Sequence, residues 1–391
     1  MHWQFFCSHN IPLNSINHVY DTLKKHADTT CRILSFLITT YCVGDYLIMD
    51  KNSDHWEYGI DEELALEITS QTPVLIGENE FTYRVTGLNW GNIPNNWSYK
   101  EATSVATDSE DNVFVFNRGN IPMIVFNPEG DVIDKWGEGI FSSPHGITID
   151  SNDQIFCVDS GDHTVRKFTK KGDLIFEIGT SGIPSEPMSG IPFGKPTHVA
   201  IDQNTNQFYV SDGYSNARIH KYSPDGNLLF SWGESGTDQG QFNIVHNIEV
   251  DSNGMVYVAD RENHRIQIFD KKGKFKNQWI NMSKAAALYI FTENETELML
   301  VGEYFAGIKP NSMGTNLGPR LSVLDLSGNV LARIGKNSYG SEAGRFFSPH
   351  GVTMDSKGNI YVAEVSWSDY GSQMNPPREL RSLQKLERVI S

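Results

Sequence analysis

One histidine recurs at the same place in three similar stretches of the chain. The stretches are FSSPHGITID, FNIVHNIEVD and FFSPHGVTMD, and five residues before the final Asp of each stand His145, His246 and His350. Imidazole is the most common metal ligand in proteins, and three imidazoles that leave one position open form a typical catalytic zinc site. The recurrence therefore predicts a metal site, with zinc first and another divalent transition metal also allowed by the ligand type.

The elements that must position these histidines are themselves repeated. From about Phe81 onward the chain repeats a unit in which an Asp, a Gly- or Asn-containing turn and short runs of alternating hydrophobicity follow one another. Each unit is predicted to hold four short antiparallel strands. Six such units indicate an all-β protein, a six-bladed β-propeller with four-stranded blades.

The sixth unit, which starts at Val352, is incomplete. We expect its third strand in LRSLQKLERV (380–389) and its outer strand in FTYRVTGLNW (81–90), which precedes the first blade. This pairing would close the ring and remove a free sheet edge.

The histidine position can be followed through all six units. It is occupied, in chain order, by Thr103, His145, Thr197, His246, about Ala287 and His350. Alternate blades of a six-bladed ring lie about 120° apart, so this register predicts a cage of three imidazoles on the axis. A single histidine here could simply cap a loop; three in register favour metal binding.

Other polar residues are expected around the same mouth of the propeller. The second strand of each unit ends in a polar residue, most of which we interpret as acceptors for loop N–H groups: Asn117, Asp159, Asp212, Asp260, Glu303 and Glu364. Glu303 and Glu364 could instead face the pocket.

Three further residues follow these strand ends. Arg118 and Arg261 could clamp a substrate carboxylate, or each could pair with a neighbouring loop acid. Tyr214 could act as a general base beside a cation, or pack as a loop aromatic.

The composition limits which binding partners and which cellular compartment we expect for this protein. The 391 residues carry a net charge of −16, which disfavours nucleic acid and anionic membranes. Three of the four cysteines lie within the first 42 residues, and no N-terminal signal is evident; we expect a cytoplasmic protein. Residues 1–75 share no repeat and are predicted to be an N-terminal extension, either a small appendage or, as we favour, a disordered segment. Residues 76–391 are predicted to form the propeller. A propeller has no open edge, so we expect a monomer.

Several stretches resemble a known family. SPHGITID, VSDGYSNARIHKYSPDGNLLFSWGE, GQFNIVHNIEVD and VYVADRENHRIQIFD are similar to the catalytic domain of peptidyl-α-hydroxyglycine α-amidating lyases (peptidylamidoglycolate lyases), a six-bladed propeller of NHL-like repeats. The likeness spans roughly 102–365. It implies zinc on the three histidines, a catalytic Tyr214 and active-site arginines at Arg118 and Arg261. The implied reaction cleaves an α-hydroxyglycine carbinolamide into an amide and glyoxylate.

The chain also departs from that family. Gly351 stands where the family has an Asp that helps to bind structural calcium, and Ser215, Tyr257 and Ile268 stand where disulfide cysteines are expected. These departures argue against structural calcium and against secretion, and they leave the substrate open: a small molecule or peptide with a carboxylate.

Two alternatives to a lyase remain at this point. One is a metal-dependent hydrolase or lactonase on the same scaffold, with Glu303 or Glu364 as its base. The other is a non-catalytic NHL propeller that binds a protein.

Overall fold

The computed structural model describes residues 47–48, 57–58, 74–86, 90–307, 317–336 and 338–389. The chain divides into two units, and the larger one consists of Val74–Tyr339 and Gly344–Ser391. The predicted N-terminal extension, 1–75, lies almost wholly outside the described residues and stays a prediction. Within it, β1 (Leu47–Ile48) pairs antiparallel with β2 (Glu57–Tyr58).

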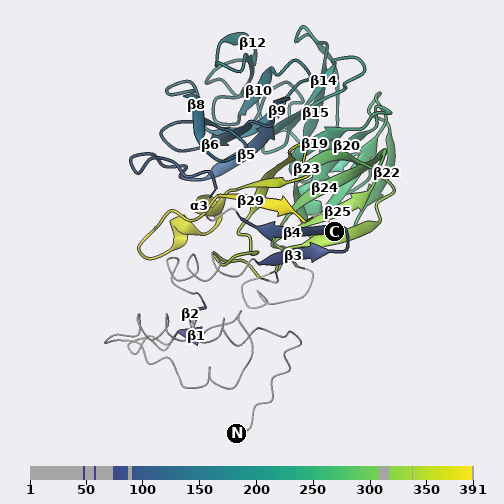
Figure 1. Cartoon of the computed structure of the whole chain (residues 1–391). Coiled ribbons are helices and arrows are strands. Elements are labelled where there is room, and N and C mark those ends of the chain that lie inside the picture. Colours follow the sequence, from purple (N-terminus) through teal and green to yellow (C-terminus); the bar gives the residue numbers. More distant parts are fainter. Residues whose placement is uncertain are drawn as a thin grey trace. The chain divides into compact units, whose positions relative to one another are not determined.

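The larger unit is a six-bladed β-propeller (Figure 1), which confirms the predicted fold class. Blade 1 consists of β5 (Ala102–Thr107), β6 (Val113–Asn117), β7 (Met123–Phe126) and β8 (Val132–Trp136). Blade 2 consists of β9 (Pro144–Ile149), β10 (Ile155–Asp159), β11 (Thr164–Phe168) and β12 (Leu174–Gly179). Blade 3 consists of β13 (His198–Ile201), β14 (Phe208–Asp212), β15 (Arg218–Tyr222) and β16 (Leu228–Trp232). Blade 4 consists of β19 (Val245–Val250), β20 (Val256–Asp260), β21 (Arg265–Phe269) and β22 (Phe275–Trp279). Blade 5 consists of β23 (Lys284–Glu293), β24 (Thr296–Tyr304), β25 (Arg320–Asp325) and β26 (Val330–Ile334). All neighbouring strands within these blades are antiparallel.

Blade 6 is built from both ends of the propeller sequence. Its order is β27 (Pro349–Met354), β28 (Ile360–Glu364), β29 (Leu383–Arg388), β4 (Phe81–Val85) and β3 (Leu75–Glu78). Figure 1 shows the yellow strand β29 beside the blue strands β4 and β3. The predicted third and outer strands are both confirmed, and β3 adds a fifth strand that the repeat does not contain.

The Asp that ends each repeated phrase forms the turn between the first two strands of its blade. Asp150 Oδ1 accepts the N–H groups of Asn152 and Gln154, each at 2.9 Å. Asp251 does the same for Asn253 and Met255. A side-chain acceptor of this kind stabilises a tight turn, so the Asp fixes where the innermost strand ends.

The apolar core lies between adjacent blades. One buried cluster combines Phe114 and Trp136 of blade 1 with Cys157 and Phe168 of blade 2. The ring centroids of Phe168 and of Trp136, the last residue of β8, are 5.1 Å apart. The innermost strands β5, β9, β13, β19, β23 and β27 contact one another in a closed ring around the axis.

Short elements connect these strands. They are β17 (Glu234–Ser235), β18 (Gln241–Phe242), η2 (Arg261–Asn263), α3 (Ser366–Asp369) and η4 (Gly371–Gln373). Within the described residues, the structure contains no helix of the length and hydropathy that a membrane crossing needs. The cytoplasmic localisation stays a prediction.

Candidate metal centre

Each of the three histidines is the extra residue of a β-bulge in an innermost strand. In blade 2, Val158 and Asp159 pair with the residues on either side of His145, which has no partner of its own. The same register shift occurs at His246 and at His350. Bulges re-aim side chains next to functional sites, and here they turn the imidazoles toward the axis.

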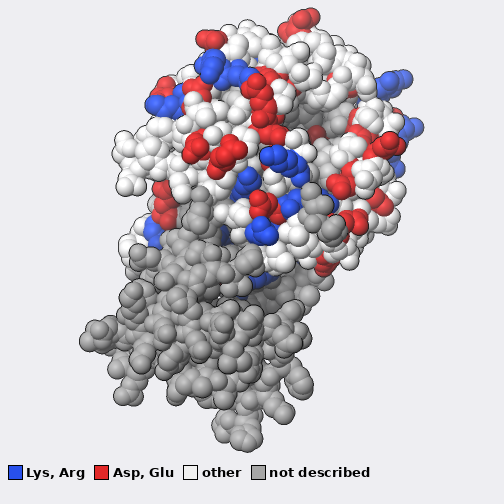
Figure 2. All heavy atoms as spheres, in the orientation of Figure 1, with Lys and Arg blue, Asp and Glu red and all other residues white. Residues whose placement is uncertain are grey.

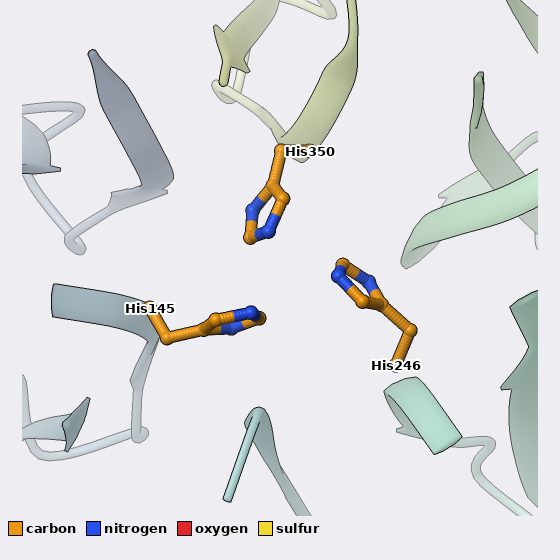
Figure 3. Close-up of side chains that lie close together, drawn as sticks. All are labelled: His145, His246 and His350. Atoms are coloured by element: carbon orange, nitrogen blue, oxygen red, sulfur yellow. The ribbon is translucent and has the colours of Figure 1, made fainter. Parts of the chain in front are cut away.

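The three imidazoles converge from three sides of the channel (Figure 3). Their ring centroids lie 4.5 Å (His145 to His350), 4.6 Å (His246 to His350) and 5.1 Å (His145 to His246) apart. All three residues are buried, and one ligand atom of each lies within 4.8 Å of the others. The arrangement could hold a metal ion.

Backbone carbonyls of the following blades fix the tautomer of each imidazole. His145 Nδ1 lies 2.7 Å from Thr197 O, His246 Nδ1 lies 2.6 Å from Ala286 O, and His350 Nδ1 lies 2.5 Å from the carbonyl oxygen of Thr103. A carbonyl oxygen only accepts, so each Nδ1 carries the proton and each Nε2 keeps a lone pair. Second-sphere hydrogen bonds of this kind accompany histidine ligands in metal sites.

These hydrogen bonds also correct one position of the sequence register. The residue in blade 5 that is equivalent to the histidines is Ala286, whose carbonyl accepts the N–H of His246. The predicted position, about Ala287, is therefore wrong by one residue. The count fails in blade 5 because the reference Asp is missing there: Phe291 stands five residues after Ala286.

The surroundings keep the imidazoles neutral, the form that binds metals. Burial lowers the pKa of His145, His246 and His350 well below the usual value. The positive charge of Arg118 lowers the pKa of His145 and His350 further, and that of Arg261 lowers the pKa of His246.

Tyr214 lies directly over this cluster. Its hydroxyl is 3.0 Å from His145 Nε2 and 3.2 Å from His246 Nε2. The preceding Gly213 lets the loop approach blade 4 closely, because a Cβ at this position would lie 1.8 Å from the carbonyl oxygen of Val245. The close approach places the phenol beside the lone pairs of two imidazoles.

The two predicted arginines line the same pocket, of about 410 Å³, together with Tyr214 and His350. Each is also paired with an acid. Arg118 donates to Glu101 at 2.7 Å, and Arg261 Nε donates to Glu262 at 2.9 Å. Both sequence interpretations of Arg118 and Arg261 therefore apply: each arginine lines the pocket, and each pairs with an acid.

The chain is similar in sequence to proteins of known families. The model of the NHL repeat matches 141–168 and 242–269. Peptidyl-alpha-hydroxyglycine alpha-amidating lyase 1 of Drosophila melanogaster is 32% identical over 253 residues, which are 61% of this chain and 45% of the fly protein. A probable peptidyl-alpha-hydroxyglycine alpha-amidating lyase of Caenorhabditis elegans is 35% identical over 44% of this chain and 49% of its own. Over part of its length, this chain is similar in sequence to the amidating lyases.

The predicted resemblance is thereby confirmed, and it has limits. NHL repeat-containing protein 3 of Mus musculus is also 34% identical, over 45% of this chain and 54% of its own. The chain spans about half the length of these relatives, so activity and substrate are matters of proposal. Among solved structures, a virginiamycin B lyase of Staphylococcus aureus aligns over 79% of this chain and 90% of its own at 14% identity, with a TM-score of 0.48, too distant to bear on function.

Glu303 and Glu364, the two glutamates that could have faced the pocket, are fully buried within their blades. Glu303 accepts two hydrogen bonds from Arg320, at 2.9 and 2.8 Å. Glu364 accepts the backbone N–H groups of Phe347 and Ser348. Both carboxylates anchor loops, and neither lines the pocket.

The residues of the pocket that sequence reasoning did not assign include Lys284, Tyr304 and Asp369. Tyr304, the last residue of β24, follows Glu303 and so holds the position of Arg118 in blade 1 and of Arg261 in blade 4. Extending that register to blade 5 would have found it. Asp369 lies in α3, within a tail that does not follow the repeat.

Proposed function

We propose that this protein is a metal-dependent lyase that cleaves the C–N bond of an α-hydroxyglycine-type carbinolamide, giving an amide and glyoxylate. The observation that carries the proposal is the hydroxyl of Tyr214, within 3.2 Å of two imidazoles of the three-histidine cluster. The similarity to proteins described as amidating lyases supports the same chemistry.

We propose zinc as the metal. His145, His246 and His350 would hold it, because three buried neutral imidazoles with fixed tautomers match the donor set of catalytic zinc. When bound, a cation with an open coordination position supplies a Lewis acid for the substrate hydroxyl.

The protein side chains would supply binding and proton transfer. Arg118 and Arg261 would hold the substrate carboxylate. Tyr214, as its phenolate, would take the proton of the α-hydroxyl group. As the carbonyl of glyoxylate forms, the C–N bond breaks with its electron pair on nitrogen, which takes that proton back from the Tyr214 hydroxyl to complete the amide. Nothing is oxidised or reduced in this step.

The substrate would be a small molecule or a peptide with a carboxylate next to the reacting carbon. On the face shown in Figure 2, basic and acidic side chains intermix and do not gather by sign. This distribution agrees with a net charge of −16 in disfavouring nucleic acid and anionic membrane as partners. We further propose a cytoplasmic monomer.

The first experiment is elemental analysis of untagged wild-type protein and of the His246→Ala variant. We expect about one zinc per wild-type chain and a loss of that zinc in the variant, because two imidazoles bind zinc far more weakly than three. Wild-type protein without any metal would overturn the lyase proposal and favour a protein-binding propeller.

The second experiment measures glyoxylate release from N-benzoyl-α-hydroxyglycine by the zinc-loaded protein. Tyr214→Phe is expected to lower kcat by about 100-fold or more, since general base catalysis contributes roughly 10²–10⁴. Unchanged kcat in this variant would remove Tyr214 from the mechanism.

A hydrolase or lactonase remains the second candidate, with a different base. Glu303 and Glu364 anchor loops, but Asp369 lines the pocket. Asp369→Asn would abolish a hydrolase that uses this carboxylate and leave lyase turnover within a few-fold. The two variants together separate the reactions.

A further inference from the structure

Tyr304 carries a buried hydroxyl group whose role the proposed reaction does not explain. The residue is 9% exposed and lines the pocket. Among the described residues, its hydroxyl oxygen has no hydrogen-bond partner. A buried polar group without a hydrogen-bond partner lowers the stability of the folded protein, and such groups are uncommon in folded proteins. An absent ligand is one physical reason for such an unpaired group at a pocket wall.

The position of Tyr304 follows the alternation of the blades. The histidines come from blades 2, 4 and 6, and the blades between them supply Arg118, Tyr214 and Tyr304. The ring of Tyr214 lies 5.4 and 5.9 Å from those of His145 and His246. The ring of Tyr304 lies 6.3 Å from those of His246 and His350. The two phenols therefore occupy neighbouring gaps of the histidine cage.

Arg261 connects the two phenols. Its guanidinium carbon lies 5.7 Å from the ring centroid of Tyr214 and 5.5 Å from that of Tyr304. The Nε of Arg261 donates a hydrogen bond to the carboxylate of Glu262. In the described part of the chain, neither terminal nitrogen of Arg261 makes a hydrogen bond. The two terminal nitrogens, which carry four N–H groups, thus remain for a ligand, and the aromatic rings beside them restrict where the guanidinium can lie.

We propose that Tyr304 is a substrate-binding residue whose O–H donates a hydrogen bond to the carboxylate held by Arg261. The ligand class is an acylated amino acid with its carboxylate on the reacting carbon. This inference deepens and rests on the proposed lyase function. A neutral phenol donor beside a guanidinium suits a carboxylate, because both groups donate and the carboxylate only accepts.

The test measures binding of N-benzoylglycine, which lacks the α-hydroxyl group and cannot react, by titration calorimetry of the metal-loaded protein. Tyr304→Phe keeps the ring and removes only the donor. We expect it to weaken binding about 10-fold or more, because hydrogen bonds to charged groups are the stronger ones. With N-benzoyl-α-hydroxyglycine, KM should rise and kcat should change little.

Tyr209→Phe is the matched control. Tyr209 is another fully buried phenol whose hydroxyl has no partner among the described residues, and it packs in the core between blades 3 and 4. Its replacement should leave binding and KM unchanged. Equal affinities of wild type and Tyr304→Phe, with metal content retained in both, would overturn the inference.

The outcomes for the two proposals can be told apart. Wild-type protein that binds N-benzoylglycine through Tyr304 but releases no glyoxylate would overturn the lyase and leave the carboxylate site in place. Wild-type protein that does not bind this probe at all would overturn the role of Tyr304.

Discussion

Gly146 and Gly351 each follow one of the cage histidines, and at both positions a side chain would strike the next blade. A Cβ at 146 would lie 2.5 Å from Thr197 O, the carbonyl that accepts the N–H of His145. A Cβ at 351 would lie 2.7 Å from the Cα of Ser104. The hydrogen bonds that fix His145 and His350 therefore depend on the absence of side chains at positions 146 and 351. The aspartate that the family resemblance led us to expect at position 351 would meet the backbone of blade 1 there.

Gly146→Ala is expected to reduce zinc affinity about 10- to 100-fold, because the methyl group displaces the carbonyl that orients His145. Competition with a chelator of known affinity measures this. Asn247→Ala is the control, since Asn247 holds the matching position after His246 and already carries a Cβ. Equal affinities in the two variants would mean that the carbonyl does not orient the ligand.

At the residue scale, the sequence predicted which side chains meet and missed how they are held. The register of His145, His246 and His350 follows from identical spacing to an Asp, which is visible in the sequence. The bulges are not visible, because a bulge depends on the pairing of the strand with its neighbour. The one-residue error at Ala286 has another cause, because Phe291 replaces the Asp from which the position is counted.

At the scale of elements, the loops that lead into the histidine strands are tied to the ends of the second strands. Asp159 accepts the N–H groups of Ser142 and Ser143, just before His145. Asp260 and Glu364 do the same for the loops before His246 and His350. The polar strand ends, which the sequence assigned to loop N–H groups, thus set the entry of each innermost strand.

Glu364→Ala should lower the free energy of unfolding by roughly 2–4 kcal/mol, because it leaves two backbone N–H groups without acceptors. It should also weaken metal binding, since those N–H groups precede His350. Glu303→Ala is matched in burial and in strand position but lies in blade 5, which supplies no histidine ligand. Denaturant unfolding and metal content of both variants check this, and equal metal loss in the two would contradict it.

The segment after β28 marks the limit of prediction at this scale. Ser368 of α3 donates to Glu101 at 2.7 and 2.6 Å, and Asp369 accepts from Ser348 at 2.5 Å. These contacts place α3 in the pocket wall. The repeat pattern could not foresee them, because the segment has no counterpart in the other five blades.

At the scale of the whole propeller, a metal ion would connect blades 2, 4 and 6 across the channel. Removal of the metal by a chelator should lower Tm by roughly 5 °C, because a ligand at 100 times its Kd stabilises a protein by about 2.7 kcal/mol. Calorimetry with and without chelator checks this. His246→Ala should show no shift, and a chelator effect of the same size in that variant would place the stabilising ion elsewhere.

Most of the ring could be predicted because the repeat encodes it. Periodic alternation, Asp turns and the residues of the closing strand are all visible in the amino-acid sequence. Strand β3 (LIGE) could not be predicted, since four residues outside the repeat carry too little pattern.

The composite sixth blade has a consequence for synthesis of the chain on the ribosome. Strand β4 emerges early, but its neighbour β29 follows about 300 residues later. At about 5–20 residues per second, β4 waits roughly 15–60 s with one edge unpaired. During that interval five blades can form in order while the ring stays open. The nascent chain is therefore most exposed to chaperones, and to pairing with other chains, just before its last strand is made.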